Sequence, residues 1–182
     1  MTEAQLMVET LVERAVSGDA AAFAELVRTQ YSLIYRIAYK WSGNAQDAED
    51  IAQDVCIKLG KSLQSFAGQS AFSSWLYRIT LNTVHDFQRS RARHQVKHSA
   101  LALVCEEQYE PDQDKHLLND EIWAQVSLLP EKQCDAVLLV YAEELSHKEA
   151  AQIMGCSEST VSWHIHEAKK GLKTLLDGDA NG

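Results

Sequence analysis

The sequence predicts an all-α protein in which a flexible acidic linker joins two helical domains. Its 182 residues are enough for two compact units of roughly 60 to 100 residues each. The chain holds only two prolines, Pro111 and Pro130, and is rich in Ala, Leu, Gln and Glu. Apolar residues recur every three or four positions, and no run alternates apolar and polar residues as a half-buried strand would.

The first two helices are expected on either side of the turn Ser42-Gly43-Asn44. One follows Asp19, and the other runs from about residue 45 to residue 63. In both, apolar side chains spaced three or four residues apart fall on one face. They are Phe23, Leu26, Val27, Tyr31, Ile34, Ile37 and Trp41 in the first helix, and Ala48, Ile51, Ala52, Val55, Leu59 and Leu63 in the second.

The second helix also carries acids along one side, at Asp47, Asp50 and Asp54. Acids in the first turn are favoured by the helix dipole and need no partner there. Because the acids continue beyond the first turn, the pattern also indicates contact with a basic protein surface.

A third helix, from about residue 71 to residue 93, is expected after a loop at 65–70. Its core stripe is predicted to contain Phe72, Leu76, Ile79, Thr83 and Phe87. A second stripe contains Trp75, Arg78, Asn82, His85 and Arg89. Aromatic, amide and cationic side chains of this kind stack on unpaired bases and hold phosphates. A solvated helix face, with Trp75 partly in the core, explains the stripe equally well.

The linker is indicated by residues 106–121, which hold seven acids, one lysine and one proline. We therefore expect an N-terminal domain over 1–95, a linker over 96–117, a second domain over 118–177 and a disordered tail over 178–182. In the second domain, helical stripes continue through Ile122, Trp123, Val126 and Leu129, and after Pro130 through Val137, Leu138, Val140 and Tyr141.

The segment 146–161 has the pattern of a helix-turn-helix. Ala151 is small enough for two helices to pack closely, and Gly155 can adopt the positive φ of a tight turn. Ser157 then serves as the N-cap of the second helix, whose residues Val161 and Ile165, and later Leu172, face the core. Its opposite face presents polar, aromatic and basic side chains to a DNA groove. A helical hairpin that never contacts DNA has the same pattern.

The net charge of −9 is unevenly distributed. Residues 1–100 hold eleven Lys and Arg against ten Asp and Glu, and all seven arginines lie there, whereas residues 101–182 hold six lysines against sixteen acids. A phosphate-binding surface is therefore expected in the first half. The acidic total argues against tight, non-specific binding of DNA by the isolated chain.

Other classes of protein find little support in the sequence. It contains no phosphate-binding loop, nucleophile elbow or paired metal motif, so we expect no enzyme, no cofactor and no metal site. The four cysteines are scattered. No apolar run approaches the roughly 20 residues of a membrane span, and no signal peptide is evident, so a cytoplasmic protein without membrane insertion is expected.

Taken in order, these motifs resemble the extracytoplasmic-function (ECF) subfamily of bacterial RNA polymerase sigma factors. The likeness covers roughly residues 10–176. It is carried by Gly18-Asp19-Ala20 to Leu26, by the acidic string Asp47 to Val55, by the string Phe66 to Asn82 around Trp75, by Leu128-Leu129-Pro130 and by the helix-turn-helix.

The resemblance implies a region 2 over the N-terminal domain and a region 4 over the second. It implies that Asp47, Asp50, Gln53 and Asp54 dock on the β′ coiled coil of core RNA polymerase. It implies that Phe66, Gln69, Ser70, Trp75, Arg78, Asn82, His85 and Arg89 capture the minus-ten element of promoter DNA as it melts.

Region 4 of the family reads the minus-thirty-five element and contacts the β flap. The implied residues here are Ser157, Ser159, Thr160, Ser162, Trp163, His164, His166, Lys169 and Lys170. An anti-sigma factor is the usual antagonist of such proteins.

The recognition helix departs from the family pattern. Relatives place basic residues after the Thr-Val pair, whereas this chain has Ser162, Trp163, His164 and Glu167. Residues 122–182 hold five lysines against nine acids, so weak phosphate anchoring is expected. Either this helix reads an unusual element, with lysines holding the backbone, or region 4 serves mainly protein contacts.

Two alternatives to a sigma factor remain at this stage. A stand-alone helix-turn-helix regulator would bind a palindrome without polymerase. A polymerase-binding regulator would dock through the acidic helix without recognising promoters.

Overall fold

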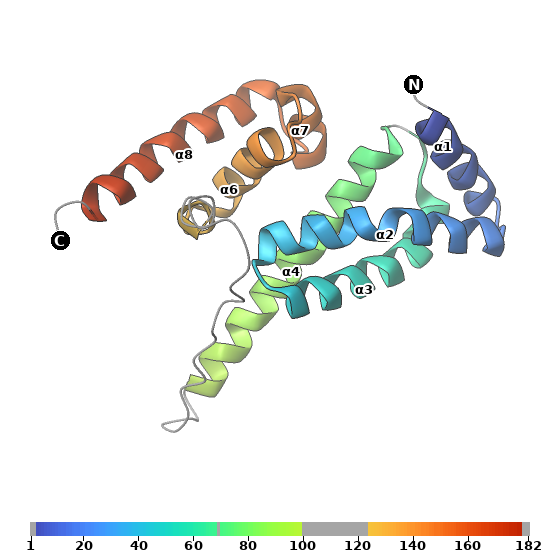
Figure 1. Cartoon of the computed structure of the whole chain (residues 1–182), viewed down its shortest axis with the longest axis horizontal. Coiled ribbons are helices and arrows are strands. Elements are labelled where there is room, and N and C mark those ends of the chain that lie inside the picture. The colour runs from blue at the N-terminus through green and yellow to red at the C-terminus, as the bar shows by residue number, and fades with distance from the viewer. Residues whose placement is uncertain (1–2, 69, 100–123, 180–182) are drawn as a thin grey trace. The chain divides into compact units, whose positions relative to one another are not determined.

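The computed structural model describes residues 3–68, 70–99 and 124–179 (Figure 1). Every regular element within these ranges is helical, which confirms the predicted all-α class. Each helix there is too short or too polar to cross a bilayer.

The chain divides into an N-terminal unit, Met1–Pro111, and a C-terminal unit, Asp112–Gly182. Parts of the sequence predictions lie outside the described residues. They are Gln69, the linker from residue 100 onward, the expected start of the second domain at 118–123, and the tail from residue 180.

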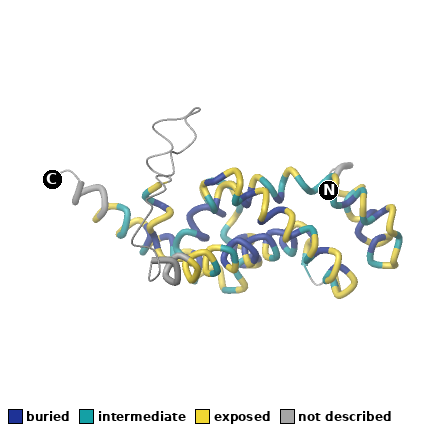
Figure 2. Tube along the Cα trace, turned by 90° about the horizontal axis from the view of Figure 1, so that it is seen from below, coloured by how far each residue is buried: buried dark blue, intermediate teal, exposed yellow. Residues whose placement is uncertain are grey.

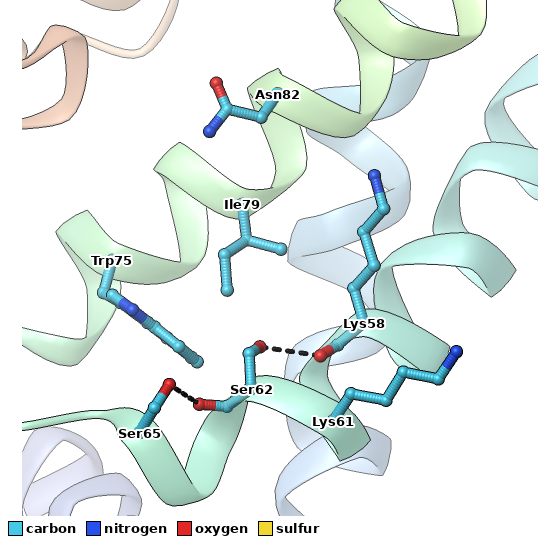
Figure 3. Close-up of a pocket in the computed structure, with 7 residues that line it drawn as sticks. All are labelled: Lys58, Lys61, Ser62, Ser65, Trp75, Ile79 and Asn82. Atoms are coloured by element: carbon cyan, nitrogen blue, oxygen red, sulfur yellow. Dashed lines mark hydrogen bonds between the residues drawn. The ribbon is translucent and has the colours of Figure 1, made fainter.

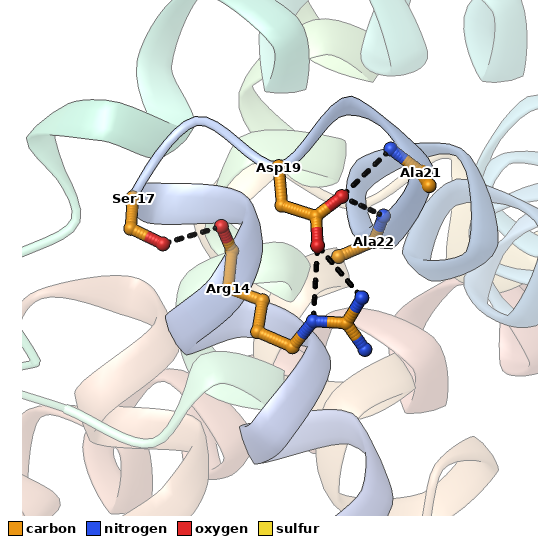
Figure 4. Close-up of polar contacts among 5 residues, drawn as sticks. All are labelled: Arg14, Ser17, Asp19, Ala21 and Ala22. Atoms are coloured by element: carbon orange, nitrogen blue, oxygen red, sulfur yellow. Dashed lines mark hydrogen bonds and ion pairs between the residues drawn. The ribbon is translucent and has the colours of Figure 1, made fainter.

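The N-terminal unit begins with α1, Glu3–Val16, a helix that was not among those predicted from the sequence. Its residues Leu11 and Val12 are buried, and α1 packs on α2, Ala20–Ser42. Asp19 caps α2 by accepting hydrogen bonds from the backbone N–H groups of Ala21 and Ala22, both at 3.0 Å (Figure 4). Arg14 donates to its other oxygen at 2.7 Å. The bond from Ala22, with Arg14 next in importance, lowers the pKa of Asp19, so this carboxylate joins the two helices in its ionised form.

The turn between α2 and α3, Ala45–Ser62, lies where the sequence predicted it. Gly43 has φ 67°, and its N–H donates to the carbonyl of Tyr39 at 2.8 Å. Asn44 then caps α3, because its side-chain oxygen accepts from the N–H of Asp47 at 2.8 Å. The short 3₁₀ helix η1, Leu63–Ser65, and a loop lead to α4, Phe72–Ser99, which continues six residues beyond the predicted end.

The core of the N-terminal unit is the meeting of α2, α3 and α4. Buried and exposed positions alternate along each helix, as amphipathic helices require (Figure 2). The largest fully buried side chains are Leu26, Ile34 and Ile37 on α2, Ile51, Val55 and Leu59 on α3, and Leu76, Thr80 and Val84 on α4. Two residues of the predicted α4 core are only half-buried, Ile79 and Phe87. Thr80 and Val84 take the central positions, so the buried face of α4 is rotated from the predicted one.

The C-terminal unit is built from α6, Glu131–Val137, α7, His147–Met154, and α8, Glu158–Asp179. The described part of this unit begins with a helical turn at 124–127. α6 starts directly after Pro130, as predicted. A π-helical turn, η2 (Leu138–Ala142), ends this helix. Residues after it turn sharply, and Glu144 has φ 54°.

α7 and α8 form the predicted helix-turn-helix. Gly155 has φ 66°, and its N–H donates to the carbonyl of Ala151. Val161, Ile165 and Ala168 of α8 are buried, and α8 packs on α6 and α7. The first two were predicted core residues.

The start of α7 provides a test of local stability. Ser146 and Glu149 cap each other: the backbone N–H of Ser146 donates to the Glu149 carboxylate at 2.9 Å, and the Ser146 hydroxyl accepts from the N–H of Glu149 at 3.3 Å. The hydroxyl also donates to the carboxylate at 2.6 Å. These bonds, first the one from the hydroxyl and then the one from the backbone, lower the pKa of Glu149 from 4.5.

We predict that Ser146→Ala lowers the free energy of unfolding of the C-terminal unit by about 1 kcal/mol at neutral pH. Because the pKa of Glu149 is lowered by folding, its contribution is present above the ordinary value of 4.5 and is lost as the pH falls through the lowered pKa. The penalty should therefore shrink in acid. Urea unfolding followed by NMR signals of α7 measures it, and Ser146→Asn should restore most of the stability. Equal stability of Ser146→Ala and the wild type would contradict the assignment.

Candidate polymerase-contact and DNA-contact surfaces

The acidic residues of α3 fall into two groups. Asp50, Gln53 and Asp54 are exposed along one face. Asp47 differs, because its side chain is only 18% exposed and is ion-paired with Arg91 of α4. The structure therefore presents three of the four predicted polymerase-contact residues, and it uses the fourth to hold α3 against α4.

Ile57 extends the exposed face of α3 by one turn. It is 56% exposed, unusual for a large aliphatic side chain, and it follows Gln53 and Asp54 at helical spacing. Ile57 was not among the predicted contact residues, although it lies outside the buried stripe that includes Val55 and Leu59. We call Asp50, Gln53, Asp54 and Ile57 the α3 face. It combines acids with an apolar side chain, a composition suited to contact with a basic and partly apolar helix surface.

A groove with a volume of about 440 Å³ lies between α3 with η1 on one side and α4 on the other (Figure 3). Its lining residues are Lys58, Lys61, Ser62 and Ser65 from the first side and Trp75, Ile79 and Asn82 from α4. The predicted α4 stripe contributed Trp75 and Asn82. The two lysines and two serines were missed, although both lysines lie off the apolar stripe of α3 in a region with few acids.

Three aromatic rings fix the end of this groove. Phe66 packs with its ring centroid 5.0 Å from Trp75 and 5.8 Å from Phe72, and the last two rings are also 5.8 Å apart. Phe72 is buried, while Phe66 and Trp75 are half-buried. The loop before α4 is thus anchored on Trp75, which still faces the groove. Phe66 is the loop residue that makes this contact with Trp75.

The remaining residues of the predicted minus-ten set lie in different surroundings. Arg78, Asn82 and Arg89 are exposed, and Ser70 is half-buried. His85 is only 5% exposed, so it is not part of the exposed stripe in which the spacing placed it. Asp86, its neighbour, is exposed instead, and it accepts hydrogen bonds from Arg89 at 3.0 Å and from Lys58 at 3.3 Å.

Three hydroxyl groups gather at the N-terminal end of α8, from Ser157 directly before the helix and from Ser159 and Thr160 within it. The Ser157 hydroxyl lies 2.8 Å from those of both Ser159 and Thr160, and it accepts the N–H of Thr160 at 3.2 Å. One turn later, Ser162 lies 2.9 Å from Nδ1 of His147, which joins α8 to α7. The contact of Ser162 with His147 joins the two helices of the helix-turn-helix. The three hydroxyl groups lie together at the N-terminal end of α8.

The middle of α8 exposes an aromatic side chain at a position after the Thr-Val pair, where the family pattern has basic residues. Trp163 is 56% exposed and His166 is also exposed. His164 is half-buried, with Nδ1 lacking a hydrogen-bond partner among the described residues. In this middle turn of α8, the exposed residues are therefore Ser162, Trp163 and His166, with no Lys or Arg among them.

Lys169 and Lys170, the predicted phosphate contacts of α8, each have a partner within the unit. Lys170 donates to Glu167 at 2.8 Å, and the ammonium of Lys169 lies 5.5 Å from the ring centroid of Tyr141. Lys170 lowers the pKa of Glu167, so that carboxylate is ionised at neutral pH. A phosphate at either lysine would have to compete with these contacts.

Two known protein families match the sequence, one in its N-terminal half and one in its C-terminal half. Residues 26–94 match Sigma-70 region 2, and residues 119–172 match Sigma-70, region 4. The matched segments correspond to the helices that carry the α3 face and the groove, and to those of the helix-turn-helix.

Relatives align with nearly the whole chain. It is 33% identical to the RNA polymerase sigma-H factor of Pseudomonas aeruginosa, over 92% of this chain and 93% of that protein. It is 32% identical to the ECF RNA polymerase sigma-E factor of Escherichia coli K12, with 92% and 93% covered. It is 35% identical to the ECF RNA polymerase sigma factor SigE of Mycolicibacterium smegmatis, over 88% of this chain and 65% of that protein.

Solved structures have the same fold. The sigma factor RpoE of Bartonella quintana, in complex with the anti-sigma factor NepR, is 26% identical and superposes with a TM-score of 0.64 over 85% of this chain and 96% of that one. CnrH, in complex with the cytosolic domain of CnrY, gives a TM-score of 0.67 over 95% and 99% at 24% identity. The chain belongs to the ECF family of RNA polymerase sigma factors, and it directs promoter-specific transcription.

Proposed function

We propose that this sigma factor docks on core RNA polymerase through the α3 face and captures one melted strand of promoter DNA in the groove between α3 and α4. The observation that carries the proposal is the groove itself. It gathers two lysines, two hydroxyls, an aromatic ring and an amide around one hollow. Stacking surface beside phosphate-binding cations is the chemistry that binds unpaired nucleotides.

The α3 face lies on the same helix as the lysines of the groove, which supports a coupling of the two contacts. Asp50 and Asp54 are exposed, and the groove residue Lys58 follows Asp54 by one turn. Docking of polymerase on α3 would thus position the strand-binding groove directly. In the proposed assignment, residues 1–95 form region 2, 96–117 the linker and 118–177 region 4.

Region 4 is proposed to read the minus-thirty-five element with α8. Ser157, Ser159 and Thr160 would contact phosphate at the end of the helix, while Trp163 would lie against a thymine methyl group in the major groove. Its exposure on the recognition helix supports this role. A region 4 that serves mainly protein contacts is the second candidate, favoured by the partners that already occupy Lys169 and Lys170.

An anti-sigma factor is a further proposed partner, because the related RpoE of Bartonella quintana was solved with one. The chain is proposed to act as a binding subunit, without catalysis of its own. Polymerase and promoters are found in the bacterial cytoplasm, so that compartment is the proposed site of action.

The first test separates Asp47 from its neighbours on α3. We expect the double variant Asp50→Ala, Asp54→Ala to weaken binding to purified core polymerase by about tenfold or more, because two exposed charges are lost from the contact. Asp47→Ala should weaken it by less than about threefold, since that carboxylate is mostly covered and paired with Arg91. Fluorescence anisotropy of the labelled full chain measures both.

In this comparison Asp47 is a matched control, an acid of the same type on the same helix. Circular dichroism checks that each variant is folded. An Asp47→Ala variant that loses as much affinity as the double variant would contradict the assignment of the α3 face.

The second test concerns Trp163. On a promoter that the chain recognises, replacing thymine by uracil in the minus-thirty-five element removes the methyl group and leaves the base pairing unchanged. We expect at least one such position to weaken holoenzyme binding by roughly three- to tenfold in the wild type and by much less in Trp163→Ala. If uracil has no effect at any position, Trp163 does not read a methyl group. If Trp163→Ala responds to uracil as strongly as the wild type, another residue reads the methyl group.

A further inference from the structure

One acid lies among the cations of the proposed strand-binding surface. Residues 51–100 contain seven Lys and Arg but only two acids, Asp54 and Asp86. Asp54 belongs to the α3 face. Asp86 lies on α4 one turn after the groove residue Asn82 and one turn before Arg89. A carboxylate at this position repels DNA phosphates, so its presence requires an explanation.

Asp86 bridges cations from two helices. One oxygen accepts from Arg89 of α4 at 3.0 Å, and the other accepts from Nζ of Lys58 on α3 at 3.3 Å. The hydrogen bond from Arg89 lowers the pKa of Asp86, and that from Lys58 contributes in the same direction. The carboxylate is therefore ionised at neutral pH, and the three side chains together carry one positive charge instead of two.

Another anion can displace Asp86 from its two cationic partners, because all three side chains are exposed. The side chain of Asp86 is 61% exposed and those of its two partners are 43% and 59% exposed. Ion pairs this exposed are weak, because water and salt screen them. A phosphate that enters the groove would meet Lys58 on the lining and compete with Asp86 for it. The carboxylate and the phosphate would thus bind Lys58 with the same kind of oxygen contact.

We propose that Asp86 is a specificity-determining residue that lowers the affinity of the groove for the backbone of any single strand. By occupying Lys58 and Arg89, it removes part of the sequence-independent attraction. Stable capture then requires the additional contacts of bases with Trp75 and Asn82. This inference rests on the proposed function of the groove as a single-strand site, and it names a residue that the proposed minus-ten set does not include.

The test uses the full chain and a fluorescently labelled oligothymidine strand, a probe without promoter sequence. Fluorescence anisotropy at several salt concentrations gives the affinity and its salt dependence. We expect Asp86→Asn to bind about three- to tenfold more tightly at low salt. The slope of log affinity against log salt should steepen by about 0.7 for each additional phosphate engaged.

A matched control exists on α2. Glu25 pairs with Arg28 three residues later, in a surface contact of the same type that is not part of the groove. Glu25→Gln removes the same charge from the same unit and should leave the slope unchanged. Combining Asp86→Asn with Lys58→Gln should remove much of the gain, because one of the released cations is then absent.

The outcomes separate the inference from the proposed function. If the wild type and Asp86→Asn bind the strand equally and with equal slopes, Asp86 does not tune specificity, while the groove remains a single-strand site. A drop in thermal stability without a change in slope would mean that Asp86 serves only the fold, which also overturns the inference. If neither chain binds the strand at any salt concentration, the proposed function of the groove is wrong and the inference falls with it.

Discussion

The packing of α3 against α4 is the contact on which both proposed surfaces of the N-terminal unit depend. Ile51, Val55 and Leu59 on α3 and Leu76 and Val84 on α4 are almost completely buried. Each such side chain contributes roughly 1.5–3 kcal/mol relative to an exposed one. This burial fixes the distance between the helices, and with it the width of the groove. It also turns the acids of α3 outward, because the apolar stripe takes up the opposite face of the helix.

Ion pairs complement this apolar packing. Asp47 with Arg91, and Asp86 with Lys58, each join α3 to α4. The pair of Asp86 with Lys58 is exposed on both sides and contributes little to stability, so its importance lies in where it places charge. The first withdraws an acid from the α3 face, and the second reduces the positive charge beside the groove. The net charge of −9 is therefore compatible with strand binding, since local arrangement and not the total determines what a phosphate meets.

Much of the fold could be predicted from the sequence because its signals are local. Helical periodicity and the turn at Gly43 located α2 and α3, and the small residue, glycine and cap of 146–161 located the helix-turn-helix. The incorrect predictions concern residues whose burial or pairing depends on tertiary packing. A period of 3.6 residues does not fix which of two adjacent stripes of α4 faces the core, so Ile79 was assigned to the core and His85 to the surface. The pairing of Asp47 with Arg91 spans 44 residues, and no local pattern reveals such a contact. The lysines of the groove were missed for the same reason, because the groove exists only once α3 lies beside α4.

The most direct test of the account is transcription by core RNA polymerase with the purified chain on a library of bacterial promoter fragments, with start sites mapped. The account predicts initiation at a defined set of promoters only when the chain is present. It also predicts that Asn82→Ala, which alters an exposed groove residue, binds core normally but opens those promoters poorly. Normal opening by this variant, or binding to core without initiation by the wild type, would contradict capture of the melted strand in the groove.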